Sequence, residues 1–326
     1  MARPTEPQSQ SKPAQPRNEP QKAAKGGISL LEVIGLAAFA ILPLLIPALR
    51  SGTVQQWLPL SLQSYLAHPA PNATQAAEEN AAQPSLLEAC ASHTYTTEIV
   101  SLDPLVVYIN NFTSHAEAEA LIQLGSADFQ DSFISRSRGG TQKDPGRTSQ
   151  SAPLPLEHPL VSCILARART FMGAMLQPDE PFSIPQLVRY YDSQRYDLHT
   201  DFWPQHQIMN DGSGRLFNRP ASFFVFMRDN CTAGETYFPA VDVLDRDAAR
   251  GGNLEASFKG KVMRGEREGK KRGVKFRPIT GNAVFWVNIG EDGRGDRRLV
   301  HAGLPVGEGE KIGLNIWPRK FYLDDI

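Results

Sequence analysis

The chain has 326 residues with 34 Lys or Arg against 35 Asp or Glu, which gives a formal net charge of −1 at pH 7. This balance gives the protein as a whole no electrostatic attraction to nucleic acid, and the length is sufficient to bury a large core. Three cysteines are too few for a disulfide framework. Cys163 lies in an amphipathic stretch and is interpreted as a buried apolar residue, while a bridge between Cys90 and Cys231 is left open.

The first fifty residues divide into two segments. Residues 1–27 are rich in Pro, Gln, Ala and Lys without apolar periodicity, and we expect them to be disordered. Residues 28–49 are almost continuously apolar, with Glu32 near one end. A helix of this length extends about 30 Å, enough to cross the hydrocarbon core of a bilayer. A cleaved signal peptide is the rival interpretation, but its apolar segment is typically only ~7–15 residues long.

The charges that flank residues 28–49 predict the orientation of this span. Basic residues outnumber acidic ones before it, whereas Glu78, Glu79 and Glu88 lie after it. The positive-inside rule therefore places the N-terminus in the cytosol and everything after residue 50 across the membrane. Glycosylation triplets at Asn72, Asn111 and Asn230 agree with a lumenal domain. We expect a single-pass type II protein in the endoplasmic reticulum or another membrane of the secretory pathway.

After a stalk at residues 50–95, a folded domain is predicted over residues 96–326. It opens with a strand in "DPLVVYINNF" and continues into a helix. Ser114 and Glu117 form a predicted capping box at the start of this helix, and Gly125 marks its end. A second helix is predicted over residues 157–172.

From residue 184 onward the sequence changes to short runs typical of strands. Two helices followed by many short strands predict helices packed on one face of a strand-rich sandwich. The runs are "IPQLVRYY", "ASFFVFM", "ETYFP", "GVKFRP", "NAVFWVNI", "RLVHAGL" and "KIGLNIWP".

The polar residues that stand out among these runs are His199, Asp201 and His301. A His-x-Asp pair with a distant His has the composition of the two-His-one-carboxylate facial triad, which binds Fe(II) and leaves positions open for other ligands. Asp in place of Cys argues against a structural zinc site. Lys311 follows ten residues after His301, and one strand and one turn would return its ammonium to the same pocket.

These residues, in this order, resemble the prolyl 4-hydroxylase family of Fe(II)/2-oxoglutarate dioxygenases over roughly residues 96–326. The resemblance is carried by several separate motifs. It implies a mostly β, α+β fold with a double-stranded β-helix (jelly-roll) core supported by N-terminal helices. The motifs are "QLVRYYDSQRYDLHTDFW", "NRPASFFVFMRDNCTAGETYFP", "GNAVFWVNI" and "HAGLPVGEGEKIGLNIW".

The resemblance also implies roles for individual residues. His199, Asp201 and His301 match the iron ligands, and Lys311 matches the residue that pairs with the C5 carboxylate of 2-oxoglutarate. Two further groups of residues are implied at the pocket, although each also has a purely structural interpretation as a core residue or a solvated surface charge. Tyr190 or Thr236 is expected beside the cosubstrate carboxylate, and Arg147, Ser149, Arg219 and Trp317 are expected on the side that faces the peptide.

Six departures from the family pattern affect the substrate side, among them Ser183 in place of a carboxylate and Arg319 in place of a histidine. Ser193 and Ala233 stand where the family often has glycine, Leu198 where it often has proline, and Ile312 where it usually has tryptophan. Residues 256–277 form a strongly basic insertion, which is either a solvated loop or a surface for an acidic polypeptide or anionic lipid. We therefore expect the reaction type to be conserved and the peptide specificity to differ.

The expected function is hydroxylation of peptidyl proline to 4-hydroxyproline in secretory-pathway polypeptides, with decarboxylation of 2-oxoglutarate to succinate. The resemblance implies Fe(II), 2-oxoglutarate, O₂ and ascorbate as cofactors, and a proline-containing polypeptide as partner. Residues 28–49 would supply the contact with the membrane, while nucleic acid is not expected as a partner. Alternatives are a dioxygenase acting on lysyl or small-molecule substrates, and a non-catalytic peptide-binding relative. The need for a partner subunit is left open.

Overall fold

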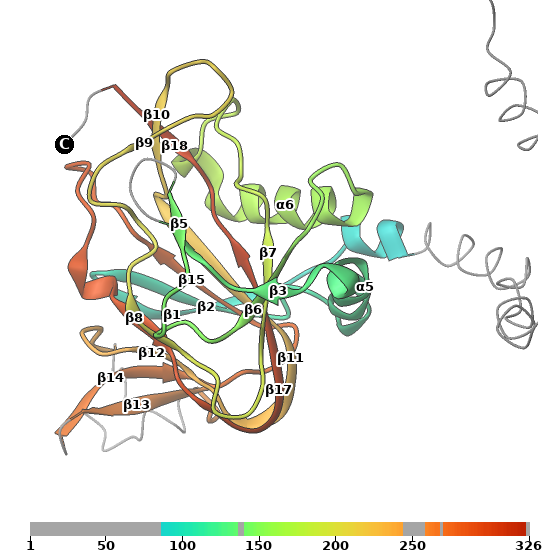
Figure 1. Cartoon of the computed structure of the whole chain (residues 1–326), viewed down its shortest axis with the longest axis vertical. Coiled ribbons are helices and arrows are strands. Elements are labelled where there is room, and N and C mark those ends of the chain that lie inside the picture. Colours follow the sequence, from blue (N-terminus) through green and yellow to red (C-terminus); the bar gives the residue numbers. More distant parts are fainter. Residues whose placement is uncertain (1–85, 136–139, 244–257, 268–269, 324–326) are drawn as a thin grey trace, which may run out of the picture. The chain divides into compact units, whose positions relative to one another are not determined.

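The computed structural model describes residues 86–135, 140–243, 258–267 and 270–323, all of which lie in one compact unit, Ala77–Ile326 (Figure 1). The predicted tail 1–27, the predicted span 28–49 and the sequon at Asn72 lie outside the described residues. Within the described ranges, no helix is both long and apolar enough to cross a bilayer.

The framework is a large antiparallel sheet of eight strands. Its strand order is β1-β2-β15-β11-β17-β7-β6-β3. The strands of this large sheet are β1 (Thr96–Leu102), β2 (Leu105–Asn110), β3 (Gln130–Asp131), β6 (Gln150–Pro153), β7 (Gln186–Tyr190), β11 (Ala221–Ala233), β15 (Ala283–Val287) and β17 (Val306–Ile316).

A small sheet of five antiparallel strands, in the order β13-β14-β12-β16-β8, contains both predicted histidine ligands. Its strands are β8 (Tyr196–His199), β12 (Thr236–Phe238), β13 (Val262–Arg267), β14 (Lys270–Phe276) and β16 (His301–Gly303). Two minor sheets complete the described strands. They contain β9 (Gln207–Ile208), β10 (Leu216–Asn218) and β18 (Lys320–Tyr322), and β4 (Ile134–Ser135) with β5 (Thr141–Gln142).

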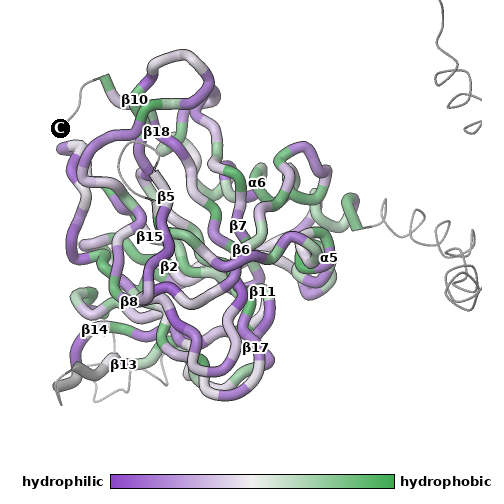
Figure 2. The backbone as a smooth tube through the Cα atoms, in the orientation of Figure 1, coloured by the Kyte–Doolittle hydropathy of each residue, from purple (hydrophilic) through white to green (hydrophobic). Residues whose placement is uncertain are grey.

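The core has two layers, one on each face of the large sheet. Along β11, Phe223, Val225 and Met227 belong to a cluster shared with the helices, whereas Phe224 and Phe226 belong to a cluster shared with the small sheet. Successive strand residues point to opposite faces, so an apolar run such as "ASFFVFM" fits a strand covered on both sides. Figure 2 shows hydrophobic segments along the strands and helices, and largely hydrophilic connections between them. The arrangement is mostly β and jelly-roll-like, with the helices on one face as predicted.

The two predicted helices are confirmed as α5 (His115–Gly125) and α6 (Pro159–Met172). The capping box is present at α5: Glu117 N donates to Ser114 Oγ, and Ser114 N donates to the Glu117 carboxylate. Both helices bury apolar residues in the helix-side cluster. Helix α6 ends before Gly173, whose φ of 55° lies in the left-handed region that favours glycine.

The interpretation of the cysteines is wrong in one respect. Cys90 and Cys163 form a disulfide, and Cys231 is free. Residues 86–91 are helical and Cys90 is buried in the helix-side cluster, so the packed domain begins before residue 96. Cys231 packs on the other face of the large sheet, which separates it from Cys90. The amphipathic pattern around Cys163 predicted a buried residue, whereas Cys163 is only partly buried, and the pattern carried no information on its partner.

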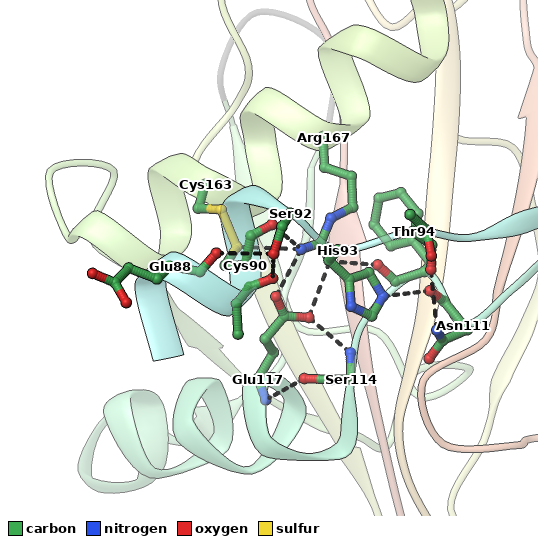
Figure 3. Close-up of polar contacts among 12 residues, drawn as sticks. Glu88, Cys90, Ser92, His93, Thr94, Asn111, Ser114, Glu117, Cys163 and Arg167 are labelled. Carbon is green, nitrogen blue, oxygen red and sulfur yellow. Dashed lines mark hydrogen bonds and ion pairs between the residues drawn. A yellow bond between two sulfur atoms is a disulfide. The ribbon is translucent and has the colours of Figure 1, made fainter. Parts of the chain in front are cut away.

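A buried ion pair joins α5, α6 and the segment that contains Cys90 (Figure 3). Arg167 donates to both carboxylate oxygens of Glu117, at 2.7 and 3.0 Å, and to the carbonyl oxygens of Phe112 and Cys90. Burial raises the pKa of Glu117, but the hydrogen bonds from Arg167 outweigh it and the pKa is lowered. The helix side of the core thus holds an ion pair whose charges are compensated within the fold.

Candidate functional site

Two neighbouring strands of the small sheet hold the two predicted histidine ligands. Strands β8 and β16 pair in antiparallel fashion with His199 directly opposite His301. Asp201 lies two residues beyond the end of β8, and its Oδ1 is 3.8 Å from His199 Nε2 and 3.9 Å from His301 Nε2. One potential ligand atom from each residue lies within 4.8 Å of the other two. The structure thus brings all three predicted ligands together.

Both imidazoles are held with the same ring nitrogen facing the centre. Nδ1 of His199 lies 2.8 Å from the carbonyl oxygen of Asp197, and Nδ1 of His301 lies 2.9 Å from that of Leu299. A carbonyl oxygen only accepts hydrogen bonds, so each Nδ1 must carry the proton. Each Nε2 therefore presents a lone pair toward Asp201, which is the tautomer that metal-ligating histidines adopt.

The carboxylate of Asp201 is oriented by two donors on its other oxygen. Oδ2 accepts hydrogen bonds from Ser222 Oγ at 2.7 Å and from Trp317 Nε1 at 3.0 Å. Asn288 Nδ2 donates to Ser222 Oγ at 2.8 Å, which directs the serine hydrogen toward Asp201. The remaining oxygen, Oδ1, faces the two histidines. Such outer hydrogen bonds fix the orientation of a metal ligand and support its affinity for the metal.

Burial and mutual interaction set the protonation of these groups. Burial and the neighbouring His301 lower the pKa of His199 to about 3. Burial favours the protonated form of Asp201, but His301, His199 and Arg219 outweigh it and lower the pKa to about 2. At neutral pH the site therefore presents a neutral His199 and an ionised carboxylate, the forms in which these side chains bind metals.

Aromatic rings enclose the two histidines. The Tyr196 ring stacks on His199 with ring centroids 3.6 Å apart. Phe238 and Trp286 lie against His301, with centroids at 5.0 and 4.8 Å. These contacts restrict rotation of the imidazoles, so the ligand positions are set by packing before any metal binds.

Lys311 is buried beside the site, on β17 directly opposite Tyr190 of β7. Its Nζ donates to the carbonyl oxygen of Gly234 at 2.5 Å and lies 5.2–5.3 Å from the ring centroids of Tyr190 and Phe224. Burial lowers the pKa of the ammonium to about 8. Gly234 has φ 78°, and a Cβ there would lie 3.0 Å from Val306 and 3.4 Å from the lysine stem.

A cleft of about 1070 Å³ opens over the metal-site residues. Thr236 and Tyr190 line it, as do Arg147, Arg219 and Trp317. Lys311 lies behind its wall, with 1 % of its surface exposed. Thr236 Oγ1 is buried and has no hydrogen-bond partner among the described residues. A buried hydroxyl without a partner is costly, so its position next to the cleft indicates a polar ligand.

Comparison with known proteins shows what the chain is similar to. No family model matches the chain. Prolyl 4-hydroxylase 1 of Arabidopsis thaliana is 27% identical over 227 residues, which cover 68% of this chain and 71% of the relative. Prolyl 4-hydroxylase 2 of the same plant is 27% identical over 220 residues, covering 67% and 68%. The chain is thus similar to prolyl 4-hydroxylases, a family of 2-oxoglutarate-dependent dioxygenases.

Solved structures of the same kind are also similar. A viral collagen prolyl hydroxylase from Paramecium Bursaria Chlorella virus-1, in complex with 2OG, aligns with a TM-score of 0.44 and 22% identity, covering 66% of this chain and 95% of that one. A prolyl hydroxylase from Trichoplax adhaerens, in complex with a hypoxia inducible factor peptide fragment, aligns with a TM-score of 0.41 and 12% identity, covering 76% and 94%.

The residues present fit the cofactors of the prolyl 4-hydroxylase family, which are Fe(II), 2-oxoglutarate and O₂. Two neutral imidazole nitrogens and one carboxylate oxygen are a donor set that suits Fe(II). The Lys311 ammonium, the Thr236 hydroxyl without a partner and the Tyr190 hydroxyl supply a cation and donors for a carboxylate. Bound iron with 2-oxoglutarate and O₂ would supply the oxidising chemistry, while these side chains bind and orient the reactants.

Behind Tyr190, a chain of hydroxyl groups leads to Arg147. Tyr190 is hydrogen-bonded to Ser149, Ser149 Oγ lies 2.9 Å from Ser132 Oγ, and Ser132 Oγ is also hydrogen-bonded to Ser151 Oγ. Arg147 Nη2 donates to Ser151 Oγ at 3.3 Å. A guanidinium only donates and a carboxylate only accepts, so a chain between them runs in one direction. With a carboxylate bound in the cleft, each hydroxyl donates toward Tyr190, whose own hydrogen then points at the ligand.

The predicted peptide contacts Arg147 and Ser149 occupy different positions. Arg147 lines the cleft, but its guanidinium donates to Phe133 O and Gln186 Oε1 and lies 4.6 Å from the centre of the Tyr196 ring. Ser149 is 1 % exposed and does not line the cleft. The prediction that Ser149 contacts the peptide therefore does not fit the structure, because its hydroxyl is directed into the wall.

Arg219 and Trp317 lie together beside Asp201. The Arg219 guanidinium lies between two indole rings, 4.3 Å from the centre of Trp203 and 3.8 Å from that of Trp317. It donates to the backbone oxygen of Asp201, and burial lowers its pKa to about 10. Trp317 lines the cleft and also orients Asp201, a contact with a metal ligand that its sequence position did not reveal.

Several residues of the site were missed in the sequence. Ser222 and Asn288 orient Asp201, yet they appeared only as part of apolar strand runs. A lone polar residue inside an apolar run is the signal that would have indicated them.

The backbone explains why the family often has glycine at two positions where this chain differs. Ser193 and Ala233 have φ of 64° and 58°, in the region where glycine is favoured.

Proposed function

We propose that the chain is a membrane-anchored dioxygenase that hydroxylates peptidyl proline in secretory-pathway polypeptides. The observation that carries this proposal is the joint arrangement of the three ligands, with Lys311 and the Thr236 hydroxyl beside them. The names of relatives to which the chain is similar suggest proline as the amino acid acted on. The overall reaction converts peptidyl proline, 2-oxoglutarate and O₂ into peptidyl hydroxyproline, succinate and CO₂.

The residues of the chain have separate tasks in this reaction. Lys311 and Thr236 would hold the distal carboxylate of 2-oxoglutarate, because a buried carboxylate needs a cation and donors. The hydrogen bonds from Ser222 and Trp317 keep Asp201 Oδ1 available to the metal. The open cleft, about 1070 Å³ in volume, has room for a polypeptide segment over the metal.

The substrate is tested with a panel of proline-containing peptides and matched peptides in which lysine replaces proline. The full chain is incubated with Fe(II), 2-oxoglutarate, O₂ and ascorbate, and the products are measured by mass spectrometry and succinate release. We expect a gain of one oxygen on proline, in proportion to succinate. Oxygen added to lysine, or succinate formation that no peptide stimulates, would contradict the assignment to proline.

The anchoring part of the proposal rests on the sequence of residues 1–50 and on the charges that flank them. It is tested on protein made in a eukaryotic secretory system. Glycosidase should increase its mobility on a gel, and protease added to intact microsomes should remove only the N-terminal tail. Digestion of the catalytic domain with protection of the tail would reverse the proposed orientation.

A further inference from the structure

A second hollow adjoins the metal cleft. It has a volume of about 560 Å³. Thr200, Phe202, Trp203 and Pro204 line both this hollow and the cleft. These residues flank Asp201 directly in the sequence, so a polypeptide that leaves the metal site over them reaches the second hollow along a continuous surface.

The charged residues that line the second hollow, among those the structure describes, are all basic. Only two of these carry a charge, Arg294 and Arg297. Neither guanidinium makes a hydrogen bond or an ion pair with any residue that the structure describes. The adjacent Arg298 differs, because it donates to the carboxylates of Asp296 and Asp103. The two arginines of the hollow are therefore available to a ligand.

Acidic residues of the same turn do not occupy this position. Glu291 and Asp292 belong to the turn but do not line the hollow. Asp292 Oδ1 accepts the backbone N–H of Arg294 at 3.0 Å, so its carboxylate serves the turn itself. The positive charge of the hollow is thus not compensated by its nearest acids in the sequence.

The turn that carries the arginines is fixed to the catalytic framework. The backbone N–H of Gly290 donates to Arg294 O, and Ile289 pairs with Gly295. Gly295 lies directly under the Phe202 ring, where a Cβ would collide with the ring. The turn therefore presents its arginines from a defined position relative to the residues that follow Asp201.

We propose that the second hollow is a subsite for an acidic side chain of the acceptor polypeptide, close in sequence to the hydroxylated residue. This rests on the proposed function in requiring a polypeptide substrate. Guanidinium groups bind carboxylates through paired hydrogen bonds, and Phe202 and Trp203 offer apolar surface to the intervening residues. Besides Asp201, four aspartates line the metal cleft against two arginines, Arg147 and Arg219, and this excess of acid disfavours an acidic segment there: Asp128, Asp131, Asp144 and Asp197.

The test uses blocked peptides with one proline and a single Glu placed at successive positions, each matched to a peptide with Gln. Binding to the full chain, loaded with Fe(II) and 2-oxoglutarate under nitrogen, is measured by fluorescence anisotropy. We expect Glu at one position to tighten binding three- to tenfold at 50 mM NaCl, and the advantage to shrink at 500 mM NaCl because exposed charges are screened.

Variants assign the effect to the hollow. The double variant Arg294→Gln/Arg297→Gln should remove the preference for Glu, whereas Arg298→Gln, which removes the same charge from an arginine already paired, should retain it. Equal binding of Glu and Gln peptides at every position, or a preference that survives in the double variant, would overturn the proposal.

Mass spectrometry on the same peptides separates the two proposals. A preference for Glu without oxygen on proline would leave the subsite standing and contradict proline hydroxylation. Hydroxylation of proline without any preference for Glu would leave the enzyme assignment standing and reject the subsite.

Discussion

Two groups of buried polar residues lie on opposite faces of the large sheet, and they differ in how completely their atoms are paired. On the helix side, the guanidinium of Arg167 is occupied by the Glu117 carboxylate and two backbone oxygens. On the side of the small sheet, polar atoms next to the cleft are buried without partners, among them Thr236 Oγ1 and Arg219 Nε.

The difference indicates which group stabilises the fold and which receives a ligand. A buried ion pair with satisfied hydrogen bonds has no capacity left for a further partner, so its loss should affect stability alone. A cluster with unpaired atoms accepts a cost in stability, which a ligand that completes the hydrogen bonds offsets. Variants of the two groups should therefore affect different measurements.

The largest effect on activity should come from the metal ligands. His199→Ala or His301→Ala should reduce iron-dependent turnover to below about one-hundredth of wild type, because even the loss of an outer partner of a ligand typically costs 10–100-fold. Bound iron, measured by metal analysis, should fall in parallel, while circular dichroism stays close to wild type. His115→Ala, at the exposed start of α5, is the matched control. Near-normal decarboxylation of 2-oxoglutarate in either variant would refute the ligand assignment.

The largest effect on stability should come from the buried ion pair on the helix side. Arg167→Met leaves the Glu117 carboxylate buried without its cation and should lower the free energy of unfolding by about 3–5 kcal/mol. Denaturant unfolding at neutral pH measures this change, and turnover per folded molecule should be unaffected. The control is Arg228→Met, which removes two ion pairs that are partly open to solvent, with Glu119 and Glu310, and should cost about 0–1 kcal/mol. Equal losses of unfolding free energy in the two variants would contradict the special role of the buried ion pair in stability.

The pH dependence of this stability follows from Glu117. The pKa of its carboxyl is lowered in the folded state, so the folded state binds fewer protons than the unfolded one near that pKa. The stabilisation is present above the ordinary pKa of glutamate and is lost as the pH falls through the lowered value. Unfolding curves between pH 7 and pH 3 should show a smaller acid loss in Arg167→Met than in wild type.

The next effect concerns Lys311. Lys311→Ala should raise the KM for 2-oxoglutarate by roughly tenfold to several hundredfold, because a charge-assisted hydrogen bond contributes about 1.5–3 kcal/mol or more in a buried site, and about 1.4 kcal/mol corresponds to a tenfold change in affinity. Bound iron should change little, since the lysine does not reach the metal centre. Lys311→Arg keeps the charge but not the shape that fits beside Gly234, so only partial recovery is expected. An unchanged KM in Lys311→Ala would mean that another residue binds the cosubstrate.

The same lysine predicts how cosubstrate binding depends on pH. Burial lowers its pKa to about 8, while Glu235 and Cys231 act in the opposite direction. A dicarboxylate binds the ammonium form, so affinity for 2-oxoglutarate should be greatest below about pH 8 and fall as the pH rises through that value. Calorimetric titration from pH 6.5 to 9.5, with Lys311→Ala as the reference, checks this. A wild-type affinity for 2-oxoglutarate that does not change with pH would mean that a cation other than Lys311 binds the cosubstrate.

The smallest effect should come from the hydroxyl chain behind Tyr190. Ser132→Ala interrupts the chain and should raise the KM for 2-oxoglutarate about two- to tenfold with a smaller change in kcat, since one neutral hydrogen bond contributes about 0.5–1.5 kcal/mol. Ser132→Thr should restore most of the affinity. Ser126→Ala, an exposed serine, is the control. An equal loss in the alanine and threonine variants would indicate packing in place of hydrogen bonding.

The sequence predicted those parts of the site that local patterns and chain order record. The spacing and order of His199, Asp201, His301 and Lys311, together with the resemblance to prolyl 4-hydroxylases, predicted one pocket, and short apolar runs located several of the strands. The pairing of Cys90 with Cys163 and of Glu117 with Arg167 was not predictable, because each pair is separated widely in the chain and meets only when α6 packs against α5 and the segment that contains Cys90. Likewise, nothing local to Arg294 or Arg297 indicates that they line a hollow.

The pairing of β8 with β16 has a consequence for folding. His199 and His301 face each other across two strands of only four and three residues. A slip of one residue would turn one imidazole to the opposite face of the sheet and abolish the site. Metal therefore binds only chains in which these strands have found the correct partner, and it stabilises that register in proportion to its concentration relative to its Kd. A bound ion would therefore favour the correct pairing of β8 with β16 during folding, independently of any role in the reaction.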